Sequence, residues 1–256
     1  VFIEIPGSLL QTHGVLARLW LSSFIQLAGS AGRSGAAMTL VVDQASGLEV
    51  FPQLQLAQRM PAGSVEVCSF WESLSQLSVR YPADWSALVN SSGLVEALGP
   101  QSPVVARELS EVFGVKAEAL TGLSASGRLT LWNGGKTESR SSVVQATASG
   151  TESRNGNRLI FAASRSVSKW QSVAEQILGS EGPVVVMESA GRAYGLTASM
   201  RSKVGPVVRL DPFGVLGGES DAFNPLDTPL DSDCSRGSYY LACAELVLFG
   251  EFRTIS

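Results

Sequence analysis

The sequence predicts an α/β fold in which helices flank a mostly parallel sheet. Two segments, residues 38–42 (MTLVV) and 183–187 (PVVVM), are continuously apolar, and such runs are typical of strands that are buried on both faces. Strand-like and helix-like stretches alternate along most of the 256 residues, as they do where helices connect parallel strands. Hydrophobic residues make up 45% of the chain, which is enough to build a substantial core.

The first half of the chain opens with an expected strand and helix. Residues 1–5 (VFIEI) form the strand, which Pro6 and Gly7 end, and Ser8 is a good N-cap for a helix over residues 9–28. Beyond the apolar strand at 38–42, we expect strands at residues 65–70 and 94–98, and helices at residues 52–60, 73–81, 83–89 and 103–113.

The second half resumes this alternation after an interruption. Residues 114–157 are rich in Ser, Thr, Gly and Asn, so they predict a flexible linker that holds a β-hairpin at most. Beyond the linker we expect strands at residues 159–162, 183–187 and 207–210, and helices at residues 170–178, 194–202 and 236–249.

Charge and cysteine content argue against two classes of function. The net charge of −4 and the pI of about 5.2 speak against a nucleic-acid footprint over the whole surface, although a locally basic channel stays open. The single histidine, His13, and the three cysteines form no metal-ligand spacing, so no His/Cys metal site is expected. We expect the cysteines to be free thiols of a reducing compartment, buried or partly buried: Cys68, Cys234 and Cys243.

The chain holds no segment that predicts a membrane span or a secretory leader. No apolar run approaches the roughly 18–20 residues that cross a bilayer. The nearest run, residues 16–28, carries Arg18 and several polar side chains. Because the chain begins at Val1 without a methionine or a charged leader, we expect no signal peptide and a fragment of a longer protein.

Asp43 and Gln44 are the first candidates for chemistry, because they directly follow the apolar strand at 38–42. In open parallel sheets, ligands bind at the carboxyl ends of the strands. A carboxylate in this place is typical of the Walker B acid that orders Mg²⁺ beside a γ-phosphate. Asp43 could equally cap the turn that follows, and the pattern alone leaves both interpretations open.

The segment ASRSVSK at residues 163–169 is the second candidate, because it lies between an expected strand and an expected helix. Strand, small-residue loop and helix N-terminus form a layout in which backbone amides point at an anion. The segment departs from G-x-x-x-x-G-K-[ST], since Ala162, Val167 and Ser168 stand at the positions of the two glycines and the lysine. Taken alone, it is a generic strand-to-helix turn.

Several segments resemble the coupling proteins of type IV secretion and conjugal DNA transfer (the TraG/TraD type). LVVDQASGLEVFPQL and FWESLSQL are similar to the Walker B region of that family and to the segment that follows it. LIFAASRSVSKW, LDPFG and FNPLD are similar to parts of its Walker A half. The most specific pieces are SLSQL, LDPFG and FNPLD, and together the similar segments cover most of the chain outside the linker.

The resemblance implies a RecA-like P-loop NTPase-type domain with its halves in permuted order. Residues 1–113 correspond to the Walker B-type half, residues 158–256 to the Walker A-type half of the same domain, and residues 114–157 to a Ser/Gly-rich linker between them. The all-α insertion of the family is missing. A permutation is tolerable where a surface linker can join the old termini.

Several positions that carry chemistry in the family are altered here. Ser168 stands at the Walker A lysine position, Gln44 at the Walker B glutamate and Glu72 at a sensor-like glutamine, so we expect no catalytic residue. Asp43 keeps the family type and is the one expected Mg²⁺ ligand. ATP and Mg²⁺ could still bind weakly, and the residues expected to contact the nucleotide are Asp43, Ser164, Arg165, Ser166, Val167, Ser168, Lys169 and Glu188.

The leading hypothesis is a non-catalytic homologue of the coupling-protein motor that serves assembly or substrate engagement. One alternative is a working ATPase in which Lys169 reaches the phosphates, and another is a protein-interaction scaffold with no nucleotide site. By resemblance, we expect secretion-system components, a relaxase or an effector as partners, DNA as a further one, and hexameric rings. The expected location is the cytoplasm, at the cytoplasmic face of a bacterial inner membrane.

Overall fold

The two continuously apolar segments are strands, as the sequence predicts. In the computed structural model, β2 (Met38–Val42) and β8 (Val184–Glu188) are buried at every residue. The structure describes residues 1–30, 37–43, 45–47, 63–132, 136–141, 157–227, 240 and 243–244. The helix expected at residues 52–60 and most of the one expected at 236–249 lie outside these residues.

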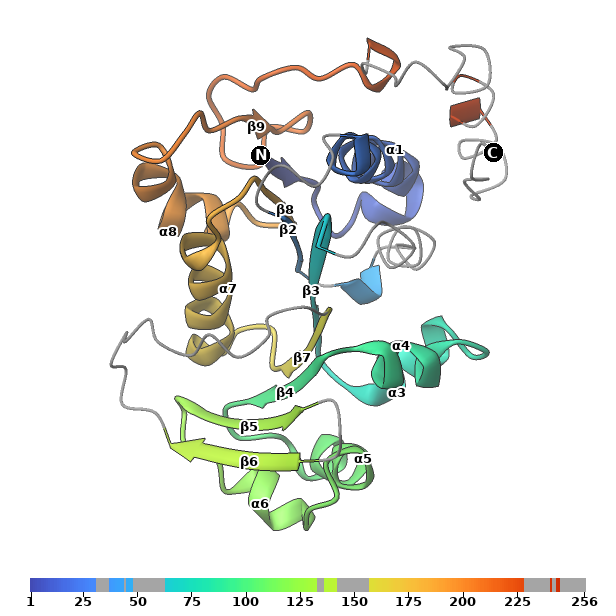
Figure 1. Ribbon diagram of the computed structural model, residues 1–256, viewed down its shortest axis with the longest axis vertical. Helices are drawn as coiled ribbons and strands as arrows, with labels where there is room; N and C mark the ends of the chain where they lie inside the picture. The colour runs from blue at the N-terminus through green and yellow to red at the C-terminus, as the bar shows by residue number, and fades with distance from the viewer. Residues whose placement is uncertain are drawn as a thin grey trace. The chain divides into compact units, whose positions relative to one another are not determined.

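The chain divides into two compact units, and unit 1 comprises residues 1–40, 47–66 and 178–256. Its hydrogen-bonded strand order is β2-β8-β1-β9, in which β1 runs parallel to both β8 and β9. Figure 1 shows α1 and α8 on opposite sides of these strands. The bounds of its other elements are β1 (Phe2–Glu4), β9 (Arg209–Leu210), α1 (Leu10–Ser30), α8 (Arg192–Arg201) and the 3₁₀ turn η3 (Pro225–Asp227). A second 3₁₀ turn, η2 (Ala45–Gly47), contributes residues to both units.

Unit 2 comprises residues 41–46 and 67–177, so β2 and β3 contribute residues to both units. Its strand order is β6-β5-β4-β7-β3-β2, in which β7 runs parallel to β3 and β4, while β5 is antiparallel to β4 and β6. The strands are β3 (Val65–Trp71), β4 (Leu94–Leu98), β5 (Gly127–Trp132), β6 (Lys136–Ser141) and β7 (Arg158–Ala162).

Helices lie on both sides of the strands of unit 2. Figure 1 shows α7 on one side of β3 and β7, and α3 and α4 on the other. The bounds are α3 (Leu74–Arg80), α4 (Trp85–Ser91), α5 (Pro103–Phe113), α6 (Ala117–Thr121) and α7 (Val167–Gly179). The fold is therefore α/β with a mostly parallel sheet flanked by helices, which confirms the predicted class.

Local sequence explains the ends of α5 well. Ser102 caps its N-terminus by accepting a hydrogen bond from the Val105 amide at 3.3 Å, and Pro103 takes the first helical position. Gly114 ends the helix with φ of +62°, the left-handed conformation that glycine adopts without cost. The buried face of α5 comprises Ala106, Leu109 and Phe113.

Residues 114–157 hold more regular structure than a linker. α6 lies there, and β5 pairs with β4 through five registered positions as well as with β6 in an antiparallel hairpin. Leu120 of α6 and Leu129 of β5 are both buried. The alternation LTLW indicates the hairpin, whereas the five residues of α6 are too few to carry a helical period, so the sequence predicts the hairpin but not α6.

The described residues include two of the three cysteines and most of the predicted helices. Cys68 is a free, buried thiol, as predicted. Cys243 is also buried, and Cys234 lies outside the described residues. Among the described helices, none combines the length and the apolar character that spanning a bilayer requires.

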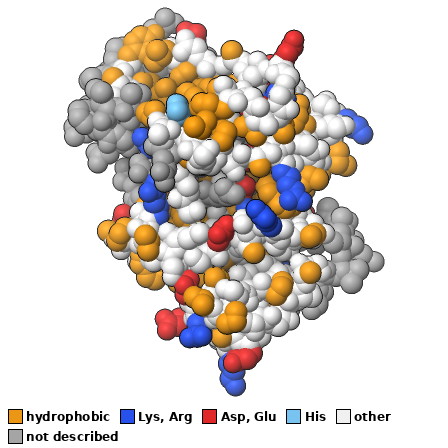
Figure 2. Space-filling view, turned by 180° about the vertical axis from the view of Figure 1, so that it is seen from behind, with side chains coloured by type: hydrophobic (Ala, Val, Ile, Leu, Met, Phe, Trp, Pro, Cys, Tyr) orange, Lys and Arg blue, Asp and Glu red, His pale blue; other side chains and the backbone are white. Residues whose placement is uncertain are grey.

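The family-like loops near the end of unit 1 have clear packing roles. Phe213 of LDPFG makes an edge contact with His13 at 5.2 Å between ring centroids, and Phe223 of FNPLD stacks on Phe24 at 4.7 Å. Both partners lie on α1. Figure 2 shows the single histidine at the surface beside hydrophobic side chains. His13 therefore packs against a loop, and its contacts give no sign of a ligand.

Replacing Gly191 by Ala is expected to lower the free energy of unfolding by about 1–3 kcal/mol. Gly191 precedes α8 with φ of +64°, and a Cβ there would overlap the side chain of Leu216. Chemical denaturation of the variant measures the loss. Gly195→Ala is the matched control, because Gly195 lies within α8 with open space around it, and it should stabilise by about 0.5–1 kcal/mol. A change of the same sign in both variants would contradict this account.

Candidate functional site

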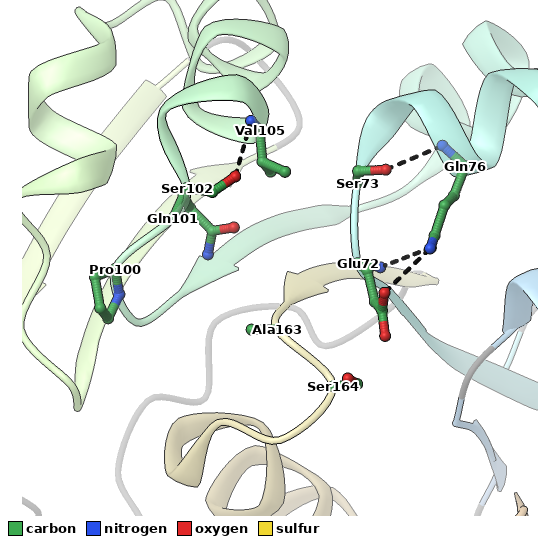
Figure 3. A pocket seen from close by; sticks show the side chains of 9 residues that line it. All are labelled: Glu72, Ser73, Gln76, Pro100, Gln101, Ser102, Val105, Ala163 and Ser164. Carbon is green, nitrogen blue, oxygen red and sulfur yellow. Dashed lines mark hydrogen bonds between the residues drawn. The ribbon is translucent and has the colours of Figure 1, made fainter.

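A cavity of about 300 Å³ opens at the carboxyl ends of β3, β4 and β7 in unit 2 (Figure 3). These ends are where parallel sheets bind ligands. Two helix starts, those of α3 and α5, also contribute to its wall. The lining residues are Glu72, Ser73, Gln76, Pro100, Gln101, Ser102, Val105, Ala163 and Ser164.

Hydrogen bonds within the wall already use several of its polar groups. Gln76 donates its amide nitrogen Nε2 to Glu72 Oε2 at 3.1 Å, and its backbone N–H donates to Ser73 Oγ at 3.1 Å (Figure 3). Gln101 is buried and donates to the carbonyl oxygens of Leu98 and Gly99. Among the described residues of the lining, one carries a carboxylate and none is a lysine or arginine. Such a wall suits a polar or cationic group better than a polyphosphate.

The connection from β7 to α7 is a tight turn of four residues, 163–166. The Ser166 amide donates to the Ala163 carbonyl at 3.0 Å, and Ser166 Oγ accepts from the Lys169 amide at 3.2 Å. Ser166 thereby caps α7, which starts at Val167 rather than at the predicted residue 170. Val167, Ser168 and Lys169 consequently lie in the first turn of the helix and not in a loop.

Lys169 points into the protein, where it meets Asp43. Lys169 is 2% exposed and Asp43 4%, and the Nζ of Lys169 forms an ion pair with Oδ1 of Asp43. The ammonium also lies 5.2 Å from the ring centroid of Trp170, a distance at which a cation is attracted to an aromatic face. Two candidates that are distant in sequence are therefore in direct contact.

The strand order explains why a long side chain makes this contact. β3 lies between β7 and β2, so the two strands whose ends precede Lys169 and Asp43 are about 10 Å apart. A lysine can cross much of this separation, whereas a short hydroxyl side chain at the same position would not reach Asp43.

The start of α7 is closely packed on the side of the turn after β4. Gly99 has φ of +67°, and a Cβ on it would lie 2.9 Å from Oγ of Ser168. Ser168 is 5% exposed and its hydroxyl lies 3.3 Å from that of Ser166. The side chain at the Walker lysine position is thus enclosed by neighbouring residues, whereas Arg165 and Val167 are exposed.

Two predicted site residues are not placed beside these groups. Glu188 lies in unit 1, where its carboxylate accepts hydrogen bonds at 2.9 Å from the amides of Ala193 and Tyr194 at the start of α8. Its assignment as a nucleotide contact stays a prediction. Gln44 lies outside the described residues. Glu72, the third altered position, lines the cavity.

Unit 1 contains a group of three buried acids, of which the sequence points to Glu188 alone. Glu4, Glu188 and Asp211 lie at or just past the ends of the neighbouring strands β1, β8 and β9, and all are buried. Glu188 and Asp211 accept backbone hydrogen bonds. Among the described residues, neither carboxylate oxygen of Glu4 has a partner. The signal in the sequence was the acid inside the apolar stretch VFIEI.

The environment of Glu4 favours its neutral form. Burial is the main cause, and the negative charges of Glu188 and Asp211 add to it, so the pKa of Glu4 rises from its ordinary 4.5 to about 7. The guanidinium of Arg209 acts in the opposite direction. Within the described part of the chain, no three His, Cys, Asp or Glu side chains are arranged to hold a metal ion.

Comparisons with known proteins give no relative: no protein-family model, no curated protein and no solved structure matches this chain. The groups that could bind a ligand or take part in a reaction lie at the strand ends of unit 2. They are the turn 163–166, the ion pair of Asp43 with Lys169, and Glu72 in the cavity wall.

Proposed function

We propose that this chain is a non-hydrolysing domain of the coupling-protein motor kind, which binds nucleotide weakly or not at all. The buried ion pair between Lys169 and Asp43 carries this proposal. A lysine that neutralises a buried carboxylate is not available to a phosphate, because withdrawing it leaves an unpaired buried charge at a cost of about 3–5 kcal/mol. This argues against the alternative in which Lys169 drives ATP hydrolysis.

The permuted P-loop arrangement is supported by which segments meet in unit 2. β2 and β3 come from the first half of the chain, and β7 and α7 come from the second. Asp43, from the Walker B-type half, contacts Lys169, from the Walker A-type half. A circularly permuted domain would bring its two halves together in this way.

The cavity wall and the turn also favour a domain without hydrolysis. Phosphoryl transfer depends on cations and donors aimed at the developing negative charge. Here Glu72 contributes a carboxylate to the wall, and the part of the lining that the structure describes holds no lysine or arginine. Ser168 packs near Gly99. These features oppose the binding of a triphosphate and its hydrolysis.

We place the activity of such a domain in assembly or in substrate engagement within a type IV secretion or conjugative DNA-transfer system. Its partners would be secretion-system components, a relaxase or an effector, with DNA as a further ligand. A hexameric ring at the cytoplasmic face of an inner membrane is the arrangement that the resemblance implies.

Nucleotide binding and turnover test this proposal directly. We expect ATP hydrolysis at background level and, with Mg-ATP at millimolar concentration, only a small thermal shift. A ligand at 100 times its Kd would stabilise the native state by about 2.7 kcal/mol, so a shift of that size would contradict weak binding. Turnover well above background that a folded Lys169→Ala variant lacks would establish the ATPase instead. A complete absence of binding agrees with the proposal and also with the scaffold, whereas weak binding excludes the scaffold.

The exposed residues at the turn and cavity offer a matched pair of variants. Glu72→Gln removes the negative charge from the wall and is expected to increase nucleotide affinity, by a factor of about 5 to 10. Arg165→Ala removes the exposed cation of the turn and is expected to decrease affinity. Both residues are exposed, so neither change should affect folding. Isothermal titration with ATP measures both, and equal affinities in the two variants would contradict an electrostatic origin of weak binding.

A further inference from the structure

We infer that the ammonium of Lys169 replaces a divalent cation at Asp43, so that any phosphate group at the neighbouring turn binds without a metal. This inference rests on the proposed P-loop-like function. It concerns whether phosphate binding at this site needs a divalent cation. A site that does not hydrolyse ATP could bind phosphate with or without a metal.

The register of the motif places Lys169 at a specific position. When residues 162–169 are aligned with G-x-x-x-x-G-K-[ST], Ser168 falls on the lysine and Lys169 on the Ser/Thr. In P-loop NTPases that Ser/Thr hydroxyl and the Walker B Asp hold Mg²⁺ between them. The same two positions are occupied here by Lys169 and Asp43, and the structure pairs them directly.

The residues at this place do not fit Mg²⁺. Magnesium demands oxygen ligands in near-octahedral geometry, and a lysine ammonium has three donors and no acceptor. Oδ1 of Asp43 is already paired with Nζ of Lys169, and both side chains are almost completely buried. No set of three metal-ligating side chains exists among the described residues. A metal could bind to Asp43 Oδ1 only by displacing this buried ammonium.

The charge of the site explains how it is stable without a metal. One negative charge at Asp43 is balanced by one positive charge on Lys169, and the face of Trp170 lies 5.2 Å from that ammonium. The backbone of Lys169 is fixed because its amide is capped by Ser166. A divalent ion would bring one more positive charge, which a phosphate would then share. With Lys169 paired to Asp43, the site has no net positive charge to offer a phosphate, which is consistent with weak nucleotide binding.

Metal binding in the absence of nucleotide tests this inference. Mn²⁺ is the probe, detected by electron paramagnetic resonance with the full chain. The wild type is expected to have no saturable site that depends on Asp43. Lys169→Thr restores a hydroxyl and vacates the space beside Asp43, so it should bind Mn²⁺ about tenfold tighter or more than the wild type. Lys169→Met, which fills the space without offering an oxygen, is the matched control and should not gain the site.

Two outcomes would overturn the inference. One is a wild-type Mn²⁺ site that Asp43→Asn removes, and the other is a folded Lys169→Thr variant that gains no metal. If Lys169→Thr does not fold, as judged by circular dichroism, the comparison of wild type with Asp43→Asn still decides. The two experiments fail independently. Mn²⁺ binding by the wild type, measured without nucleotide, would overturn the metal inference but not the proposed lack of hydrolysis. ATP turnover would overturn the proposed lack of hydrolysis but would not change the Mn²⁺ result.

Discussion

Replacing Lys169 by Met is expected to lower the free energy of unfolding by about 3–5 kcal/mol. The substitution keeps a long unbranched side chain and removes the ammonium, so little cavity is created. What changes is the partner of Asp43, whose carboxylate stays 4% exposed with its ion pair broken. An uncompensated buried charge is among the few defects that cost this much. Urea denaturation near neutral pH measures the loss.

The double variant with Asp43→Asn separates the ion pair from other effects of the substitution. Removing both charges leaves no uncompensated ion, so the double variant should be more stable than Lys169→Met alone. Lys116→Met is the surface control, because Lys116 is exposed, and it should change stability by no more than about 0.5 kcal/mol. A loss below about 1 kcal/mol in Lys169→Met would mean that the pair is solvated and would weaken the proposed function.

The sequence predicts the strands of this fold well for a physical reason. β2 and β8 are covered on both faces, so burial selects apolar residues at every position and leaves a continuous signal. The start of α7 was predicted three residues late because ASRSVSK contains three serines, each able to cap a helix. Which one caps depends on where β7 ends and on the contact that Lys169 must reach.

The candidate site was only partly predictable from the sequence. Asp43 and Lys169 could each be identified from a strand end and a turn, but their contact depends on the strand order β7-β3-β2. Neighbouring positions along a chain do not encode which strands become neighbours in a sheet. The sequence therefore left Lys169 as an alternative phosphate ligand, and the structure gives it a buried carboxylate as partner.

Glu4 shows the same limit in unit 1. Its strand VFIEI could lie at the edge of a sheet with the carboxylate in water, or in the middle with the carboxylate buried. β1 lies between β8 and β9, so Glu4 is completely buried beside Glu188. Only the sheet order reveals that this acid has a raised pKa, and that it affects stability through protonation.

Stability should fall as pH rises from about 4.5 to about 7, because native Glu4 holds its proton in that window while the unfolded chain has released it. The raised pKa corresponds to about 3 kcal/mol, present below pH 4.5 and lost above pH 7. Glu96 also has a raised pKa from burial, so the pH dependence of the wild type does not give the contribution of Glu4 alone.

Glu4→Gln should therefore stabilise the protein by about 2–3 kcal/mol more at about pH 8 than at about pH 5. Denaturant titrations at both pH values measure this difference, with exposed Glu118→Gln as the control that should show none. An equal effect of Glu4→Gln at both values would mean that Glu4 is ionised in the native state throughout.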